Sequence, residues 1–269
     1  MKKNILILSG VLVTFSLLAY GVIDSKDSVT DQEIASNIVL NPVDKEIKEN
    51  FNVKAYPDFA YDVGSRFMST ITKEDLHKAK SLLDFLPKEQ TDPVFRYKSV
   101  SVIILDDFRQ TDKREIGYSE VLTDAQIKLL QSTDYSTNFL IRADFQEMSS
   151  DVNHLVNNYF TPHMTVVPEN EAVYVNGKDA LIDYLKENSK EKTTIVNEKK
   201  VKSGKIFFTV TKEGDISNVN LTSTSGYPSI DLYMIELIKS IPGAWEAASN
   251  SIGQKVDQEL VFSFGTIGC

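Results

Sequence analysis

GKIFFTVTKEGDISNV, residues 204–219, is the stretch of this 269-residue chain with the clearest structural pattern. Ile206, Phe208 and Val210 alternate with residues of a second face, which is the period-two pattern of a strand. The Glu-Gly-Asp turn that follows has Gly214 at its centre, and glycine adopts positive φ at little cost. Apolar residues then alternate again on the return strand. The stretch therefore predicts a β-hairpin.

The residues after the hairpin predict a helix and a last strand. Residues 223–227 interrupt the return strand, and Pro242 stops the helix. One face of that helix carries Ile230, Met234, Leu237 and Ile238. Gly253 then turns the chain into a strand over 256–264. The order strand, strand, helix, strand predicts a small antiparallel sheet of three strands packed on a helix.

The residues before the hairpin add a short extended piece and a second helix. Residues 171–174 are extended in pattern, and Asn176-Gly177 is a turn dipeptide. Residues 178–186 place their apolar side chains on one helical face. The highly charged stretch 188–203 predicts a loop with a surface turn. These pieces extend the C-terminal domain to residues 171–269.

The ordered set of segments resembles the C-terminal domain of TonB-type energy transducers over about residues 171–266. The hairpin matches the strand, turn and strand of that family. STSGY at 223–227 followed by Ile230-Asp231 is similar to the start of its helix, and PGAW at 242–245 is similar to its tryptophan segment. The structural positions of the motif are Gly214, Gly226, Asp231, Trp245 and Gly253. We expect turn glycines, a carboxylate that favours the helix dipole, and a tryptophan packed in the core.

The resemblance implies a protein that binds a partner polypeptide and has no cofactor and no enzymatic activity. In the family the last strand lies at a sheet edge and receives an extended segment of an outer-membrane transporter. The unpaired N–H and C=O groups of such an edge are satisfied by the added strand. Gln258 and Ser263 are expected to point outward near the partner. The implied partner-binding strand contains Val256, Gln258, Leu260, Phe262 and Ser263. A homodimer is compatible with this arrangement.

Three departures from the family bear on energy transduction. Ala247 stands where the family has a proline, and the proline-rich spacer is missing. Family members that couple to proton-driven motor subunits often carry a serine and a histidine one helical turn apart in the membrane. Here Ser16 and Tyr20 have that spacing, without a histidine. The binding of a partner is therefore better supported than the coupling to a motor.

The N-terminus predicts export. Lys2 and Lys3 precede residues 4–23, which carry no charge and would form a helix of roughly 30 Å, the thickness of a bilayer core. We interpret residues 1–23 as a single-pass inner-membrane anchor with a cytoplasmic N-terminus and the bulk of the chain in the periplasm. The alternative is a signal peptide cleaved after Ala19-Tyr20-Gly21, which would leave a periplasmic protein.

Between anchor and C-terminal domain we expect a polar linker over 24–55 and an unassigned α+β domain over 56–168. No family or function follows from the pattern of that domain. Its predicted elements are a helix from Thr72 to Leu86, a strand over 99–105, a helix capped by Thr123 and Gln126, and strands over 138–145 and 163–167. The fold class of the whole chain is therefore α+β.

Charge and cysteine usage narrow the remaining functions. The formal net charge of −9 argues against nucleic acid, whose binding depends on Lys and Arg contacts to phosphate. Cys269 is the single cysteine, so neither an intramolecular disulfide nor a cysteine-rich zinc site can form.

The chain contains no recognisable catalytic or metal motif. His77, His154 and His163 are not arranged as H-E-x-x-H, and no G-x-S-x-G or P-loop sequence occurs. The acidic stretch 106–112 favours a polar loop over a cation site. An interaction protein that binds no metal is thus the leading interpretation, and a non-energised periplasmic adaptor is the alternative. An envelope enzyme with its site in 56–168 is the third.

Overall fold

The computed structural model describes residues 59–149, 154–194, 196 and 200–266. Their fold is α+β, with two sheets that each carry their helices on one face. We call residues 69–167 the N-terminal lobe. Residues 60–64 together with 171–266 form the C-terminal lobe.

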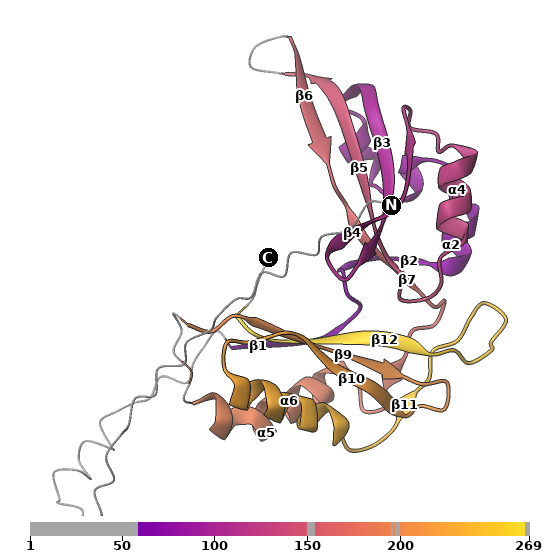
Figure 1. Ribbon diagram of the computed structural model, residues 1–269. Helices are drawn as coiled ribbons and strands as arrows, with labels where there is room; N and C mark the ends of the chain where they lie inside the picture. Colours follow the sequence, from indigo (N-terminus) through magenta and orange to yellow (C-terminus); the bar gives the residue numbers. More distant parts are fainter. Residues whose placement is uncertain (1–58, 150–153, 195, 197–199, 267–269) are drawn as a thin grey trace, which may run out of the picture. The chain divides into compact units, whose positions relative to one another are not determined.

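The sheet of the C-terminal lobe has four strands, and every neighbouring pair is antiparallel. Helices α5 (Lys178–Thr193) and α6 (Pro228–Lys239) lie against one face of it (Figure 1). The strands, in spatial order, are β1 (Ala60–Gly64), β12 (Gln258–Gly265), β9 (Ser203–Val210) and β10 (Ile216–Ser223). A separate ribbon pairs β8 (Val173–Tyr174) with β11 (Trp245–Glu246).

Alternation along β9 and β12 builds the core of this lobe. Phe208, Phe262 and Phe264 are fully buried between the sheet and the two helices. Gly204 is required here, because a Cβ atom at that position would lie 2.5 Å from the ring of Phe264. The predicted hairpin is confirmed, and Gly214 at its turn has φ of 88°.

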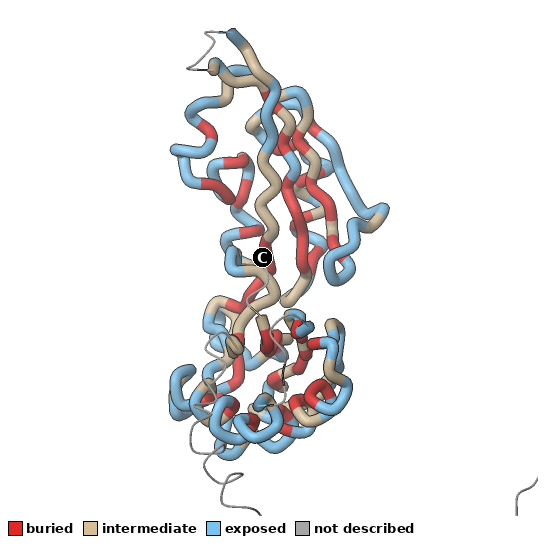
Figure 2. Tube along the Cα trace, turned by 90° about the vertical axis from the view of Figure 1, so that its left-hand side faces the viewer, coloured by how far each residue is buried: buried red, intermediate tan, exposed pale blue. Residues whose placement is uncertain are grey.

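The sheet of the N-terminal lobe has the order β2-β7-β5-β3-β4, with β6 also paired to β5. Its β2 and β7 are parallel, and all other pairs are antiparallel. The strands are β2 (Ser69–Thr72), β3 (Val94–Asp106), β4 (Arg109–Gly117), β5 (Asn138–Met148), β6 (Leu155–Phe160) and β7 (His163–Val167). Figure 2 shows buried residues along the inner strands of this sheet.

Short helices cover one face of this second sheet and enclose its core. They are α2 (Lys73–Lys78), the 3-10 turn η1 (Leu82–Asp84), α3 (Lys88–Thr91) and α4 (Asp124–Gln131). Both predicted caps are confirmed. Thr72 Oγ1 accepts the N–H of Asp75 at 3.1 Å, and Thr123 and Gln126 form a reciprocal capping box.

Two sequence predictions about helix length were wrong. The helix predicted from Thr72 to Leu86 ends at Lys78, because the chain then pairs with the segment before α4. Leu82 N–H donates to Glu120 O at 3.0 Å, and Leu122 N–H donates to Lys80 O at 2.8 Å. Conversely, α5 continues to Thr193 and includes residues that we expected in a loop.

No helix among the described residues is both long and apolar enough to cross a membrane. The predicted anchor over residues 1–23, with Ser16 and Tyr20, lies outside the described part of the chain, and so do the linker over 24–55 and Cys269.

Candidate functional site

The strand that sequence analysis assigned to partner binding is not at an open edge. β12 pairs with β9 on one side and with β1 on the other, in a register that runs from Ala60 opposite Gly265 to Gly64 opposite Val261. Residues 60–64, which we had placed in the preceding domain, thus complete the C-terminal sheet. The chain itself supplies the added strand that we expected from a partner.

Side chains on both faces fix β1 in this position. Val63 is 6% exposed and belongs to the core between sheet and helices. Tyr61 stacks on Phe262, with ring centroids 6.1 Å apart, and its hydroxyl is 2.6 Å from Ser189 Oγ of α5. Burial raises the pKa of Tyr61, against the lowering effect of its hydrogen bonds. On the other face, Asp62 forms an ion pair of 2.7 Å with Lys178.

The predicted partner-binding residues are distributed differently from our expectation. Gln258, Leu260 and Phe262 are buried on the helix-facing side, and Ser263 is half-buried on the opposite face. Val256 lies before β12, where its N–H donates to Ala248 O at 2.9 Å. The outward position expected for Gln258 is wrong.

The Gln258 amide instead closes a contact with the segment before β8. Its Oε1 accepts the N–H of Ala172 at 2.7 Å, and its Nε2 donates to Glu171 at 2.8 Å. This buried amide therefore connects β12 to the short extended piece at the start of the lobe.

The remaining motif residues have the structural roles expected of them. Gly226 and Gly253 have φ of 87° and 77°, which suits glycine. Trp245 is 8% exposed and packs against Tyr174 and Phe208, with ring centroids 5.6 and 5.8 Å apart. Within the described residues its Nε1 has no hydrogen-bond partner. The motif thus builds the fold and exposes no chemical group.

Asp231 explains the run of small polar residues before α6. Its carboxylate is 3% exposed and accepts hydrogen bonds from Ser225 N–H at 2.9 Å, from Ser225 Oγ at 2.6 Å and from Thr224 Oγ1. These bonds satisfy the oxygens of a buried carboxyl group and hold the loop against the first turn of the helix.

An apolar pocket of about 260 Å³ lies beside the end of β1. Val63 and Gly64 form one wall, and Leu260 of β12 and Leu181 of α5 contribute to the lining. The remaining lining residues are Glu171, Ala172, Val173, Tyr174, Lys178 and Trp245. Its wall is thus formed by β1, the sheet, one helix and the β8–β11 ribbon.

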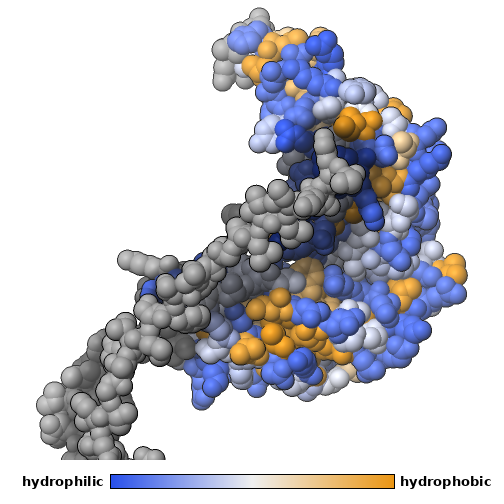
Figure 3. All heavy atoms as spheres, in the orientation of Figure 1, coloured by the Kyte–Doolittle hydropathy of each residue, from blue (hydrophilic) through white to orange (hydrophobic). Residues whose placement is uncertain are grey.

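The other outer strand of the sheet is β10. Figure 3 shows hydrophobic residues gathered over β10 and α6 on a largely hydrophilic face, and Leu221 and Leu232 are exposed. The register of β10 against β9 shifts twice, and Asn218 has φ of 51°. Such irregularities disrupt the ladder and protect an edge from further pairing. The β1 side is therefore the better candidate for strand addition.

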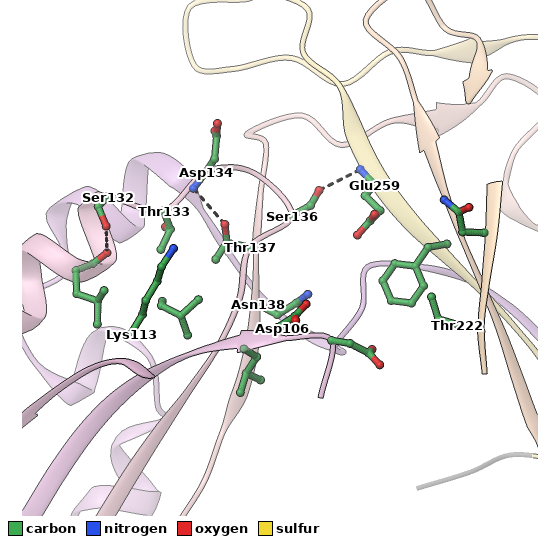
Figure 4. A pocket seen from close by; sticks show the side chains of 16 residues that line it. Asp106, Lys113, Ser132, Thr133, Asp134, Ser136, Thr137, Asn138, Thr222 and Glu259 are labelled. Atoms are coloured by element: carbon green, nitrogen blue, oxygen red, sulfur yellow. Dashed lines mark hydrogen bonds between the residues drawn. The ribbon is translucent and has the colours of Figure 1, made fainter. Parts of the chain in front are cut away.

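A larger and more polar cleft, of about 530 Å³, lies between the loops at one end of the N-terminal sheet and the outer face of the C-terminal sheet. Figure 4 shows Asp106, Asp134 and Glu259 around it, with hydroxyls from residues 132–137. Ser132 Oγ donates to Leu129 O, and Ser136 Oγ accepts Glu259 N–H at 3.0 Å. These hydroxyls are engaged by the backbone, and the residues that line the cleft include no histidine.

Arg66 lies close to this cleft and ties the two lobes together. Its guanidinium pairs with Asp107 at 2.7 Å and lies 3.5 Å from the ring centroid of Phe108 and 5.3 Å from that of Phe207. Burial lowers the pKa of Arg66, partly offset by Asp107. Burial also raises the pKa of Glu259, against the lowering effect of Arg66.

The three histidines lie on separate elements. His77 is in the last turn of α2, His163 begins β7 with Nδ1 2.9 Å from Thr161 O, and His154 precedes β6. In the described ranges, no group of three His, Cys, Asp or Glu residues could hold a metal ion.

The strand β1 is the element of this candidate site that sequence reasoning missed. Its signal was the alternation of Tyr61 and Val63 with Ala60 and Asp62, too short to distinguish from a loop. No protein-family model, no curated protein and no solved structure matches this chain.

Proposed function

We propose that this chain is a TonB-like cell-envelope protein that binds an extended segment of an outer-membrane transporter by strand addition. The segment takes the place of β1 against β12. The protein is held in the inner membrane by residues 1–23 with its bulk in the periplasm, and transmits energy or a binding signal to the transporter.

The pairing of β1 with β12 is the observation that carries this proposal. β1 comes from a segment more than one hundred residues before the rest of its lobe. It pairs through backbone groups along Val261–Gly265 and buries one aliphatic side chain. Once β1 leaves, this edge of β12 would offer what strand addition requires, namely unpaired backbone groups and a pocket for alternate side chains.

Exchange conserves the interactions at this edge. An incoming strand would replace the ladder hydrogen bonds of β1 one for one. The difference in binding free energy between the incoming strand and β1 therefore depends on the side chains that face the core. The order of α5, β9, β10, α6 and β12 in residues 178–265, with the two-residue β11 before the last strand, further supports the family resemblance.

A disulfide across β1 and β12 tests the exchange. In a Cys269→Ser background, Asp62→Cys with Ser263→Cys joins two residues that lie directly opposite each other. The probe is a fluorescent peptide of residues 57–66, PDFAYDVGSR, added to the full chain in detergent. We expect the oxidised protein to lose peptide binding and the reduced protein to regain it.

The matched control joins β9 to β10, through Thr209→Cys with Ser217→Cys, which are also directly opposite. This variant should bind the peptide in both redox states. Undiminished binding by the oxidised Asp62/Ser263 variant would overturn exchange at β12.

A second candidate is an adaptor that uses the same edge without a motor. It is favoured by the absence of a histidine in residues 4–23 and of a proline-rich spacer. Copurification from crosslinked membranes separates the two functions. Recovery of motor subunits with a transporter supports transduction, and recovery of a transporter or another envelope protein alone supports the adaptor.

A further inference from the structure

The antiparallel register of β1 on β12 can be continued past the last residue of β1. Gly64 lies opposite Val261, so the next position of an extended strand, that of Ser65, would lie opposite Leu260. Side chains alternate along a strand, so this position shares the helix-facing side with Val63. Leu260 is 4% exposed and lines the apolar pocket beside β1.

The chain itself does not use this position. After Gly64 it leaves the sheet, and Ser65 Oγ donates to Glu171 Oε2 at 3.0 Å on the rim of the pocket. The same carboxylate oxygen accepts the Nε2 of Gln258. β1 therefore ends at the wall of the pocket, and the position of Ser65 brings no apolar side chain to it.

We infer that this pocket receives a large apolar side chain of the incoming segment, located two residues after the residue that replaces Val63. The inference rests on the proposed function, because it concerns a strand that takes the place of β1. A segment with such a residue would bury apolar surface that β1 leaves unburied, and this difference would favour the segment over β1.

The size and chemistry of the pocket fit one side chain. Its volume of about 260 Å³ lies below the roughly 300–1,000 Å³ of typical small-molecule sites. Leu181, Tyr174, Trp245 and Leu260 give it an apolar lining. Of its charged groups, Glu171 bonds to Gln258, and Lys178 would pair with the acidic residue that replaces Asp62. The side chain that enters the pocket therefore needs no charge.

The pocket also defines the pattern of the partner segment. The position of Tyr61 favours an aromatic residue that reaches Phe262 and Ser189, and that of Val63 favours an aliphatic residue. Between them, the position of Asp62 favours an acidic residue beside Lys178. The expected partner is an extended segment with the order aromatic, acidic, aliphatic, any residue, large apolar.

Two fluorescent peptides test the inference on the full wild-type chain in detergent. The first is PDFAYDVGSR, and the second carries Ser65→Leu. Burial of a leucine side chain corresponds to roughly tenfold or more in affinity, so the second peptide should bind about tenfold tighter. A third peptide with Ala60→Leu adds apolar surface on the opposite face, away from the pocket, and should bind like the first.

The outcomes separate the two proposals. If no peptide binds, the proposed strand exchange fails. If the peptides bind with equal affinity, strand exchange stands and the pocket inference is overturned. The same holds if the Ala60→Leu peptide gains as much affinity as the Ser65→Leu peptide.

A variant of the protein tests whether the higher affinity of the Ser65→Leu peptide comes from this pocket. Ala172 is a half-buried lining residue, and Ala172→Phe would fill the pocket. We expect it to abolish the advantage of the Ser65→Leu peptide while binding of the first peptide changes less than about threefold. An advantage that persists in a folded Ala172→Phe protein would contradict the assignment. Since the peptide comparison uses the wild-type chain, it stands even if this variant does not fold.

Discussion

The strands β1 and β2 are separated by four residues, Ser65–Met68, yet they complete two different sheets. Both are short outer strands. β1 is antiparallel to β12, whereas β2 is parallel to β7. The stretch 60–72 thereby joins the N-terminal and C-terminal lobes, with Arg66 between them.

The two strands differ in how many other structural elements they support. Thr72 ends β2 and also caps α2, and Ile71 packs in the same core as Leu76 of that helix. Loss of β2 would therefore disrupt a helix as well as a ladder. No helix begins or ends in β1, which contributes one buried aliphatic residue to its core. We therefore expect β2 to be a fixed part of its sheet and β1 to be the strand that leaves its sheet in the proposed exchange.

We expect the largest loss of stability from truncating a side chain of β12 on which β1 packs. Phe262 is fully buried and contacts the rings of Tyr61 and Phe264. Phe262→Ala would destabilise the C-terminal lobe by about 3–5 kcal/mol, because it leaves a cavity in the core. Chemical denaturation measures this loss. A loss below about 1 kcal/mol would contradict the packing described here.

A matched pair of substitutions sharpens the comparison. Ile71→Ala in β2 should destabilise by about 2–4 kcal/mol and leave peptide binding at β12 unchanged. Val63→Ala in β1 should destabilise by about 1–2 kcal/mol, since fewer methyl groups lose their burial. It should also increase binding of the residue 57–66 peptide, because β1 then competes less well.

Denaturation and peptide titration of the two variants provide both readouts. The comparison between fixed and exchangeable strands would be wrong if Ile71→Ala increased peptide binding as much as Val63→Ala.

The smallest effect concerns pH at the contact of β12 with the N-terminal lobe. Because burial raises the pKa of Glu259, its ionisation opposes folding. That penalty is absent below the ordinary pKa of glutamate and fully present above the raised value. Glu259→Gln should therefore gain stability relative to the wild type as pH rises from about 4 to 7. The gain should stay below about 1 kcal/mol, since the carboxylate is partly exposed and screened.

Thermal unfolding of wild type and variant across this pH range measures the difference. Glu213→Gln, in the exposed turn after β9, is the control and should show no such trend. A Glu259→Gln protein that loses stability with rising pH would show that its attraction to Arg66 outweighs desolvation.

The elements with local signals could be predicted from sequence. The hairpin around Gly214 and the capped helices at Thr72 and Thr123 each carry their own turn or cap residues, and the structure confirms them. The α+β class follows from these elements. The core position of Trp245 and the place of Asp231 in the first turn of its helix agree with the prediction, whereas the burial of Asp231 was not predicted.

The predictions that failed depend on contacts between distant segments. The helix after Thr72 stops because residues 80–82 pair with 120–122, which no local pattern indicates. Strand β4 was missed because its exposed, polar sequence resembles a loop. Strand β6, LVNNYF, was missed because its apolar residues do not alternate with polar ones. The open edge of β12 was predicted from 171–269 alone, where the residues that cover it do not occur. The candidate site could therefore not be predicted in full, because it depends on a short segment that pairs with a strand far away in the sequence.

The covalent attachment of β1 has a consequence for the affinity of any partner. β1 is joined through the four residues Ser65–Met68 to the folded N-terminal lobe of the same chain, so it acts at a high effective concentration, whereas a segment on another protein acts at its real concentration. The apparent dissociation constant of the partner is its intrinsic value divided by the fraction of molecules in which β1 has left. In the proposed exchange, β1 would therefore set a threshold. A segment that pairs with β12 no better than β1 does would occupy the edge only at concentrations near the effective concentration of β1, and a better-matched segment would bind at lower concentrations.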